Sequence, residues 1–375
     1  MKRQFPANPD LTLEEFELNM GPQHPSTHGV LRLKLTLDGE RVVRCKPEIG
    51  YLHRSIEKIA ENRTYTQIIP ITDRLDYCTS MTSNYVYVMA VETLADITVP
   101  PRAEYIRVIM SELNRIASHL LWYGTLALEL GGTTPFIYGF RDREKVLDLF
   151  EATCGARLLY NYLRFGGVSR DLPEDFCERM LAFLDEWEPL IRREYEDLLD
   201  ENPIFYNRTK KVGFLSAEKA MAYGVSGPNL RASGIARDVR REHPYSVYPE
   251  LEFDIPVRTE GDVFARYRVR MEEMRQSARI LRQCAEKLPG GPYLEPQPLR
   301  MVIPEGETYV HLESPRGDIG CYLVSQGTDK PYRCKFRTPS FHHIEVFQHL
   351  VHDCLIPDIV SICGSFDVVL PETDR

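Results

Sequence analysis

The stretch between Pro100-Pro101 and Gly131-Gly132 constrains the fold more than any other part of the sequence. From Arg102 to Leu130, apolar residues recur at three- and four-residue steps, with charged residues between them. This period places the apolar side chains on one face of an α-helix. Proline favours the start of a helix and glycine its end, so we expect one long helix between the two pairs. Its apolar positions are Ile106, Ile109, Leu113, Ile116, Leu120 and Leu121.

Helical patterns occupy most of the chain after about residue 54, and β patterns lie near its two ends. Val30 to Asp38 alternates apolar and polar residues, and Asp38-Gly39 is a common hairpin turn. The first twenty residues predict an extended lead-in. The further predicted helices cover 76–94, 141–164, 173–200, 261–288, 340–351 and 355–363, and the further predicted strands cover 40–45, 308–312, 320–325 and 331–337.

These elements predict a mainly α fold with small β elements at both ends. We divide the chain into an N-terminal extension with a β-hairpin (1–53), a helical body (54–300) and a C-terminal β/α segment that packs on the same body (301–375). Gly- and Pro-rich stretches separate the helices.

The composition is that of a globular protein large enough to bury a substantial core. The chain has 375 residues, 43% of them hydrophobic and 27% charged, with a net charge of −9. An acidic chain of this kind does not resemble a general nucleic-acid binder. No stretch is apolar for long enough to span a membrane, and residues 1–6 are not followed by the apolar segment of a signal peptide. We therefore expect a soluble, cytoplasmic chain, which is compatible with docking on a membrane complex.

The nine cysteines do not indicate a metal site or a disulfide framework. Their number is odd, and no two have the Cys-x-x-Cys spacing of zinc or iron–sulfur ligands. We expect them to be reduced. The chain also lacks the glycine-rich sequence patterns of nucleotide-binding proteins.

Two short segments and one carboxylate are candidates for chemistry. The loop over 21–29 contains His24 and His28 between prolines and glycines, and it fits packing, hydrogen-bond or proton chemistry, or metal binding. Asp73-Arg74-Leu75-Asp76-Tyr77 precedes a predicted helix, whose N-terminus suits Asp73 and Asp76. Tyr77 by itself fits an amphipathic core residue. Glu129 ends the long helix, where it is either solvated or paired with a cation.

Four of the ten histidines lie between positions 342 and 352. On a helix, Glu345, His349 and His352 would share one face, which is a conceivable metal site. The pattern favours a polar surface helix instead.

Long blocks of this sequence resemble the family of the 49-kilodalton subunit, also called the D subunit, of NADH:quinone oxidoreductase, respiratory complex I. The resemblance runs from about residue 18 to the C-terminus. It rests on GPQHPSTHGVLRL (21–33), GYLHRSIEKIAENRTYTQ (50–67), DRLDY (73–77), VPPRAEYIRVIMSELNRIASHLLW (99–122), TPFIYGFRDRE (134–144), SPRGDIGCYLVSQG (314–327) and the closing Asp374-Arg375.

The resemblance implies the fold of the large subunit of [NiFe] hydrogenases. In those proteins two Cys-x-x-Cys pairs hold the metals. Here DRLDY stands where the first pair would be, and Val369 and Glu372 fall at the positions of the second. A nickel–iron centre needs thiolates, so the resemblance implies a chain that holds no metal.

The resemblance also implies a quinone-reduction site between this chain and a smaller partner. His28 and Tyr77 match the two residues that hydrogen-bond the quinone headgroup, where a phenol and an imidazole stabilise the charge and supply protons. His53 and Arg54 match the same cavity region, with Asp73 in support. Arg74 matches the arginine near the partner's terminal 4Fe-4S cluster, where a positive charge raises the cluster's reduction potential.

Two positions depart from the family pattern. Glu129 falls where the family usually has an aspartate paired with the loop histidine, so the added methylene changes the geometry of that pair. Tyr160 replaces a histidine near the cluster. Because a phenol has an ordinary pKa of about 10, we expect the cluster potential to depend weakly on pH.

The implied function is that of a peripheral-arm subunit of a proton-translocating NADH:quinone oxidoreductase. The chain itself would bind no cofactor, since FMN, NADH and the clusters belong to other subunits. The implied partners are the small, cluster-bearing B subunit, the C subunit, the H subunit of the membrane arm and other peripheral-arm subunits, on the cytoplasmic side of the plasma membrane. Alternatives are the same subunit in a ferredoxin- or F420-dependent complex, a non-catalytic scaffold subunit, and a genuine hydrogenase.

Overall fold

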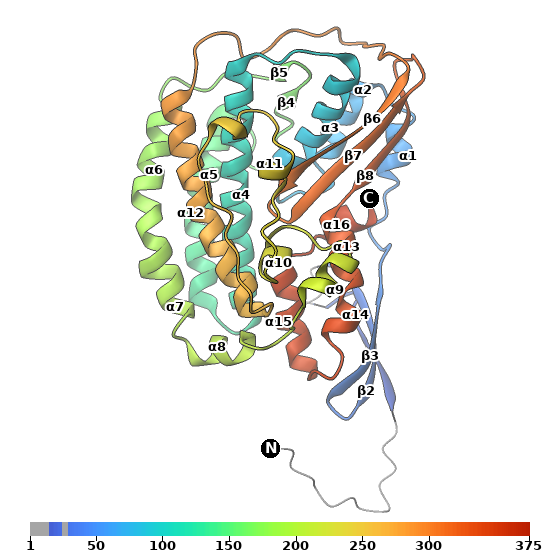
Figure 1. Ribbon diagram of the computed structural model, residues 1–375, viewed down its shortest axis with the longest axis vertical. Coiled ribbons are helices and arrows are strands. Elements are labelled where there is room, and N and C mark those ends of the chain that lie inside the picture. Colours follow the sequence, from blue (N-terminus) through green and yellow to red (C-terminus); the bar gives the residue numbers. More distant parts are fainter. Residues whose placement is uncertain (1–14, 25–28) are drawn as a thin grey trace, which may run out of the picture.

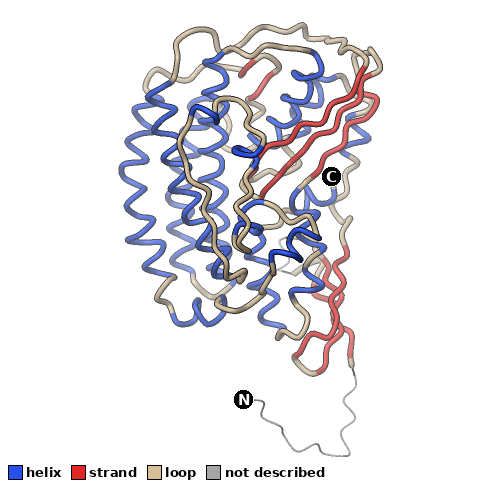
Figure 2. Tube along the Cα trace, viewed as in Figure 1, coloured by secondary structure: helices blue, strands red, loops and turns tan. Residues whose placement is uncertain are grey.

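A computed structural model describes residues 15–24 and 29–375 of the chain. Long helices form one side of the molecule, and a three-stranded sheet covers the upper part of the other side (Figure 1). A second three-stranded sheet projects at the lower end, beside helices from the C-terminal part of the chain (Figures 1 and 2).

The long predicted helix is present as α4, Pro101–Glu129, with its ends at the predicted proline and glycine pairs. Ile106, Ile109, Leu113 and Ile116 are fully buried. The helix packs against α3 (Ser80–Ala95), α5 (Thr133–Cys154), α12 (Val263–Lys287) and α15 (Ile356–Phe366). Neighbours on several sides explain why so many of its side chains are inaccessible to solvent.

The other predicted helices differ from the observed ones mainly at their ends. The helix predicted over 141–164 begins earlier and ends at Cys154, because Gly155 adopts a left-handed conformation with φ 76°. Two short strands follow, β4 (Leu163–Arg164) and β5 (Gly167–Val168). The helix predicted over 173–200 is α6 (Phe176–Leu190), continued by a π-helical turn, Ile191–Glu196, and by α7 (Asp197–Leu199).

Shorter helices fill the connections between these elements. They are α1 (Ile56–Ala60), α2 (Tyr65–Thr72), α8 (Pro203–Thr209), α9 (Ala217–Ala222), α10 (Gly227–Arg231), α11 (Val239–Glu242), the 3-10 helix Tyr248–Glu250, α13 (Pro339–Glu345), α14 (Phe347–Leu350) and α16 (Leu370–Asp374).

The upper sheet consists of the three strands predicted in the C-terminal part. They are β6 (Gly306–Ser314), β7 (Gly317–Ser325) and β8 (Pro331–Arg337), paired antiparallel in this order. The sheet packs against α3. Ser314 pairs with Gly317, so Pro315-Arg316 forms a two-residue turn.

The lower sheet contains the predicted hairpin and one strand that the sequence did not predict. The hairpin is β2 (Arg32–Asp38) with β3 (Arg41–Glu48), and β1 (Phe16–Met20) pairs antiparallel with β2. Residues 16–20 are extended, as predicted, but their pairing with β2 was not predicted. Leu31, Leu33, Leu35 and Leu37 are fully buried, and they share one apolar cluster with residues of α14 and α15. The division of the chain at 53 and 300 stays a prediction.

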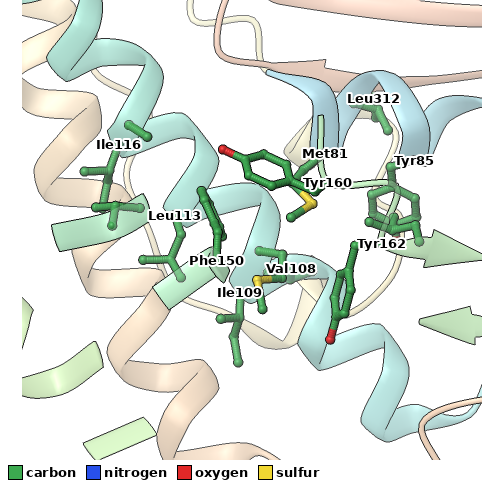
Figure 3. Close-up of a cluster of buried hydrophobic side chains, with 14 of the residues drawn as sticks. Met81, Tyr85, Val108, Ile109, Leu113, Ile116, Phe150, Tyr160, Tyr162 and Leu312 are labelled. Atoms are coloured by element: carbon green, nitrogen blue, oxygen red, sulfur yellow. The ribbon is translucent and has the colours of Figure 1, made fainter. Parts of the chain in front are cut away.

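A larger apolar cluster lies between α3, α4, α5 and the upper sheet. Figure 3 shows Met81, Leu113, Phe150 and Tyr160 within it. The rings of Phe150 and Tyr160 lie 4.6 Å apart between their centroids. Within 15–24 and 29–375, no helix is long and apolar enough to cross a membrane.

The histidine-rich stretch forms two short helices, and the predicted polar face is exposed at Glu345, His349 and His352, but the opposite side is buried. His343 is fully buried, and its ring contacts the amide nitrogen of Asn229 at 3.2 Å. His343 also receives a hydrogen bond from the backbone N–H of Ser226, at 3.4 Å. Among the described residues, no three His, Cys, Asp or Glu side chains are grouped so that they could hold a metal ion.

Candidate functional site

Tyr77 lies on the connection between α2 and α3, and its side chain reaches the surface. It is 42% exposed, although its neighbours Asp76 and Cys78 are buried. The Asp76 carboxylate accepts hydrogen bonds from the backbone N–H groups of Cys78 (3.0 Å) and Thr79 (3.3 Å). These bonds form a turn at the position where the sequence predicts the start of a helix. The helix α3 therefore begins at Ser80 and not at Asp76. The core role that the sequence alone suggests for Tyr77 is wrong, because its ring remains accessible.

The surroundings of Tyr77 keep its hydroxyl protonated. Burial raises the pKa of Tyr77 to about 12, and the Cys78 thiol and Asp76 carboxylate add to the shift. A phenol of this kind is a stable hydrogen-bond donor at neutral pH. It therefore suits a ligand oxygen that accepts a hydrogen bond.

A buried arginine, Arg316, fixes the Tyr77 connection to the C-terminal part of the chain. Its guanidinium donates to the Asp76 carboxylate, to the backbone oxygen of Asp367 (2.8 Å) and to the Asp367 carboxylate (3.2 Å). Burial alone would lower the pKa of Arg316, but the two carboxylates hold it well above its ordinary value. Sequence reasoning did not single out Arg316, although it lies in the quoted block SPRGDIG.

Asp73 is buried on the same connection, at the C-terminal end of α2. Its carboxylate accepts a hydrogen bond of 2.6 Å from the backbone N–H of Asn161. Burial raises the pKa of Asp73 to about 7, against the opposing effects of this bond and of Arg74. Asp73 therefore titrates near neutral pH, and it occupies a helix C-terminus rather than the predicted N-terminus.

The structure brings Arg54 and Arg74 together, and their roles at a quinone site stay a prediction. Arg54 donates a hydrogen bond of 2.6 Å to the backbone oxygen of Arg74. Arg74 itself is exposed and donates to the backbone oxygen of Pro70. Its charge is thus held at the surface and remains open to a partner.

His53 is held by the C-terminus of the chain. Its Nδ1 donates to the backbone oxygen of Asp374 (2.7 Å). The Asp374 carboxylate in turn accepts from the backbone N–H groups of Gly50 (2.8 Å) and Leu52 (2.7 Å). An open cavity of about 440 Å³ lies beside these contacts between Asp374 and the 50–53 segment. His53, Phe341 and Asp374 are among its lining residues.

Glu129 is partly buried at the end of α4 and points at α15. A Cβ built on Gly364 would stand 2.1 Å from Glu129 Oε2, so the carboxylate occupies the space that a larger residue would need. The indole N–H of Trp122 on α4 donates to the Gly364 carbonyl (2.8 Å), which fixes the position of α15 along α4. Burial raises the pKa of Glu129 to about 8. The solvated alternative for Glu129 is therefore wrong.

His28 lies outside the described residues, so its relation to Tyr77 and Glu129 stays a prediction. The loop that contains it is closed at its base, because His24 and Gly29 form an antiparallel bridge. Its two ends are thus held together.

The positions of the lost cysteines are occupied by groups that do not suit a soft metal. The Glu372 carboxylate is buried and accepts from the backbone N–H of Ser340 (2.9 Å). Burial and the Asp76 carboxylate raise the pKa of Glu372 to about 8. Cys78 lies beside Tyr77, but burial raises the pKa of its thiol to about 12, and a neutral thiol is a poor metal ligand.

Tyr160 is buried against Phe150, as Figure 3 shows. Burial raises the pKa of Tyr160 far above its ordinary value. The phenol therefore does not titrate near neutral pH.

Comparisons with known proteins point to one family. The family described as respiratory-chain NADH dehydrogenase, 49 Kd subunit, matches residues 129–303 and 297–375. A protein of Syntrophobacter fumaroxidans, named as the D subunit of NADH-quinone oxidoreductase, is 50% identical over 100% of both chains. Proteins of the same name from Desulforamulus reducens and Dehalococcoides mccartyi are 52% and 53% identical over 96% of this chain, and cover 98% and 99% of their own lengths.

Proposed function

This chain belongs to the 49-kilodalton subunit family of respiratory-chain NADH dehydrogenase, and from that premise we propose that it forms a quinone-reduction site around Tyr77 and His28. It is a subunit of an NADH dehydrogenase (quinone), a membrane-associated complex whose other subunits are its partners. The observation that carries the proposal is the exposed Tyr77 phenol between the buried Asp76 and Cys78, on a connection that Arg316 fixes.

The chemistry of quinone reduction suits this arrangement. Two electrons place negative charge on the two carbonyl oxygens, and two protons complete the quinol. The Tyr77 hydroxyl, protonated at neutral pH, donates to one oxygen, and the His28 imidazole donates to the other. The buried ion pairs behind Tyr77 hold its backbone in place, so little reorganisation accompanies the reaction.

The electrons come from a partner in this proposal. A 4Fe-4S cluster in the small B subunit lies near the exposed Arg74, and NADH and FMN are bound by other subunits. The donor groups around Tyr77 fit a quinone, an organic molecule with two hydrogen-bond acceptors, better than a resident metal. The chain docks on the cytoplasmic side of the membrane against the C subunit and the H subunit of the membrane arm. The weak pH dependence of the cluster potential stays a prediction.

Replacing Tyr77 with phenylalanine tests the proposal. We expect membranes that carry Tyr77→Phe to lose most NADH-dependent quinone reduction, because one donor to the headgroup is gone. NADH oxidation by ferricyanide, which accepts electrons before they reach the quinone, should be unchanged.

Tyr206→Phe is the matched control, because Tyr206 is 43% exposed and lies on α8. Its quinone and ferricyanide activities should both equal those of the unmodified protein. Full quinone activity in Tyr77→Phe would contradict the proposal and favour a scaffold role. Failure of unmodified membranes to oxidise NADH would favour a ferredoxin- or F420-dependent complex.

A further inference from the structure

Among the fully buried polar atoms that have no hydrogen-bond partner within the described part of the chain, three come from parts of the fold that pack together. They are His119 Nδ1 on α4, Arg270 Nε on α12 and Asp367 Oδ2 directly after α15. Burial of such an atom without a partner is costly, and native proteins commonly satisfy it with an internal water molecule. None of these residues belongs to the set that the family resemblance singles out.

The three groups act on one another electrostatically. Burial raises the pKa of Asp367, and Arg316, Arg270 and His119 oppose this shift. Burial lowers the pKa of Arg270, and Asp367 opposes that shift in turn. The helices α4, α12 and α15 contact each other in all three pairs, as their positions in Figure 1 indicate. The three groups therefore lie in one region, where the three helices pack together.

Their remaining contacts hold the three side chains in place. The Arg270 guanidinium lies 4.5 Å from the centre of the Trp122 ring and donates to Asn229 Oδ1 (3.1 Å). Arg316 donates to the other oxygen of Asp367 (3.2 Å). His119 Nε2 lies 2.9 Å from the Glu273 carboxylate.

The protonation states make these atoms complementary to one water molecule. Burial lowers the pKa of His119, so its ring is neutral. Burial alone would raise the pKa of Glu273, but Arg231 lowers it well below its ordinary value, so the ionised carboxylate accepts from Nε2–H of His119. His119 Nδ1 is then an acceptor, and Arg270 Nε–H is a donor. Asp367 is ion-paired with Arg316 through Oδ1 (3.2 Å), which leaves Oδ2 as a second acceptor.

We propose that His119, Arg270 and Asp367 hold one internal water molecule. The water donates to His119 Nδ1 and Asp367 Oδ2 and accepts from Arg270 Nε, which gives it the usual three hydrogen bonds. Its place joins two buried networks. One contains Asp76, Arg316 and Asp367 behind Tyr77, and the other contains His119, Glu273 and Arg231.

The bridge makes His119 a positioning residue for the Tyr77 connection, a consequence that rests on the proposed function. Asp367 is in a left-handed conformation, with φ 54°, which is unfavourable for a residue with a side chain. Contacts to Arg316 and to the water hold it there, and Arg316 holds Asp76 in turn. The charged groups around the bridge are Arg115, Arg231 and Glu273 on one side and Asp76 and Arg316 on the other.

A cryo-electron microscopy map of the assembled complex, at a resolution that shows waters, tests the bridge directly. We expect a peak at about 3 Å from all three atoms. Direct contact between His119 Nδ1 and Asp367 Oδ2, or a dry space between them, would overturn the proposal. This readout does not depend on the outcome for Tyr77→Phe, so the two proposals can fail separately.

Variants at His119 test the positioning role. His119→Phe removes the acceptor, and we expect the peak to disappear and the KM for quinone to rise about fivefold, the effect of one hydrogen bond. His119→Gln retains a side-chain acceptor, so it should keep most of the water peak and a quinone KM close to that of the unmodified protein. His311→Phe, at a partly buried histidine paired with Asp318 (3.0 Å), is the control and should change neither. An unchanged quinone KM in His119→Phe with normal assembly would refute the positioning role.

Discussion

At position 364 any side chain would collide with Glu129. The built Cβ stands 2.1 Å from Oε2 and 3.1 Å from a methyl group of Leu126. Both neighbouring atoms are the ends of side chains on α4, so a larger residue at 364 would require the Glu129 carboxylate to leave this space. Glycine at 364 therefore allows a carboxylate with one more methylene than the family's usual aspartate to fit beneath α15.

Replacing Gly364 with alanine tests this fit. We expect Gly364→Ala to lower the free energy of unfolding by about 1–3 kcal/mol, as overpacking commonly does. The double variant Gly364→Ala with Glu129→Asp should recover part of the loss, because the shorter side chain withdraws the oxygen. Thermal unfolding of the two variants and of the unmodified protein measures the effect, and equal stability of all three proteins would contradict the packing argument.

The buried Asp73 makes the stability of the chain depend on pH. Its pKa is about 7 in the folded chain and 3.8 when unperturbed, so the folded state binds more protons between these values. Stability therefore falls as the pH rises from about 4 to about 7. We expect Asp73→Asn to remove this part of the decline, since the amide stays neutral and its oxygen can still accept from Asn161. Denaturation midpoints at pH 5 and pH 8 measure it, and an undiminished decline in the variant would refute the assignment.

At the scale of elements, the C-terminus acts as a clamp on the segment that contains His53. Asp374 closes α16 and binds two backbone N–H groups of a segment more than 300 residues earlier in the chain. Arg375 donates to the backbone oxygen of Phe336 on β8 (2.9 Å). The C-terminal residues thus form hydrogen bonds with both the 50–53 segment and β8.

Removing the clamp should loosen the 50–53 segment without unfolding the body. We expect Asp374→Ala to cost about 1–2 kcal/mol locally, because two backbone donors lose their acceptor. Asp374→Asn retains one acceptor oxygen and should lie between this variant and the unmodified protein. Hydrogen exchange at Gly50 and Leu52 provides the measurement, and protection that is unchanged in Asp374→Ala would show that another group holds the segment.

A comparison of the predicted and observed elements indicates which elements a sequence pattern can predict. The long amphipathic helix and the three C-terminal strands were predicted almost to the residue, because period and turn residues act locally. β1 was missed, since a five-residue strand without buried alternation forms only by pairing with β2. The start of α3 was placed too early because Asp76 binds backbone N–H groups in the turn before the helix.

Across the whole molecule, a buried network of charges connects α4, α11, α12 and the upper sheet. Arg115, Arg231 and Arg240 face four carboxylates, and every member is nearly inaccessible to solvent. The carboxylates are Glu112, Asp238, Glu273 and Glu313. Each charge is stable inside because it is paired, Arg115 with Glu112 on the same helix, and Arg231 and Arg240 also with carboxylates on other elements.

Loss of one carboxylate from this network should destabilise the whole fold. Glu112 accepts from Arg115 (3.1 Å), Arg240 (3.0 Å) and Tyr248 (2.7 Å). We expect Glu112→Gln to cost about 3–5 kcal/mol, because the buried Arg115 loses its ion-pair partner and Arg240 retains only Asp238. Denaturant unfolding measures it, with Glu178→Gln on the exposed face of α6 as the neutral control. A cost no larger than that of the control would contradict the role of the network.

The sequence by itself determined the helical body, the placement of the β elements and the family, because periodicity, turn residues and long motif blocks are all readable along the chain. It also marked Tyr77, Arg74, His53 and Glu129 as site residues through that resemblance. Only the tertiary structure decided that Tyr77 is exposed, that Glu129 lies against Gly364, and that Arg316 and Asp367 hold the Tyr77 connection. Burial and pKa depend on neighbours hundreds of residues away, and no local pattern records which distant segments will meet.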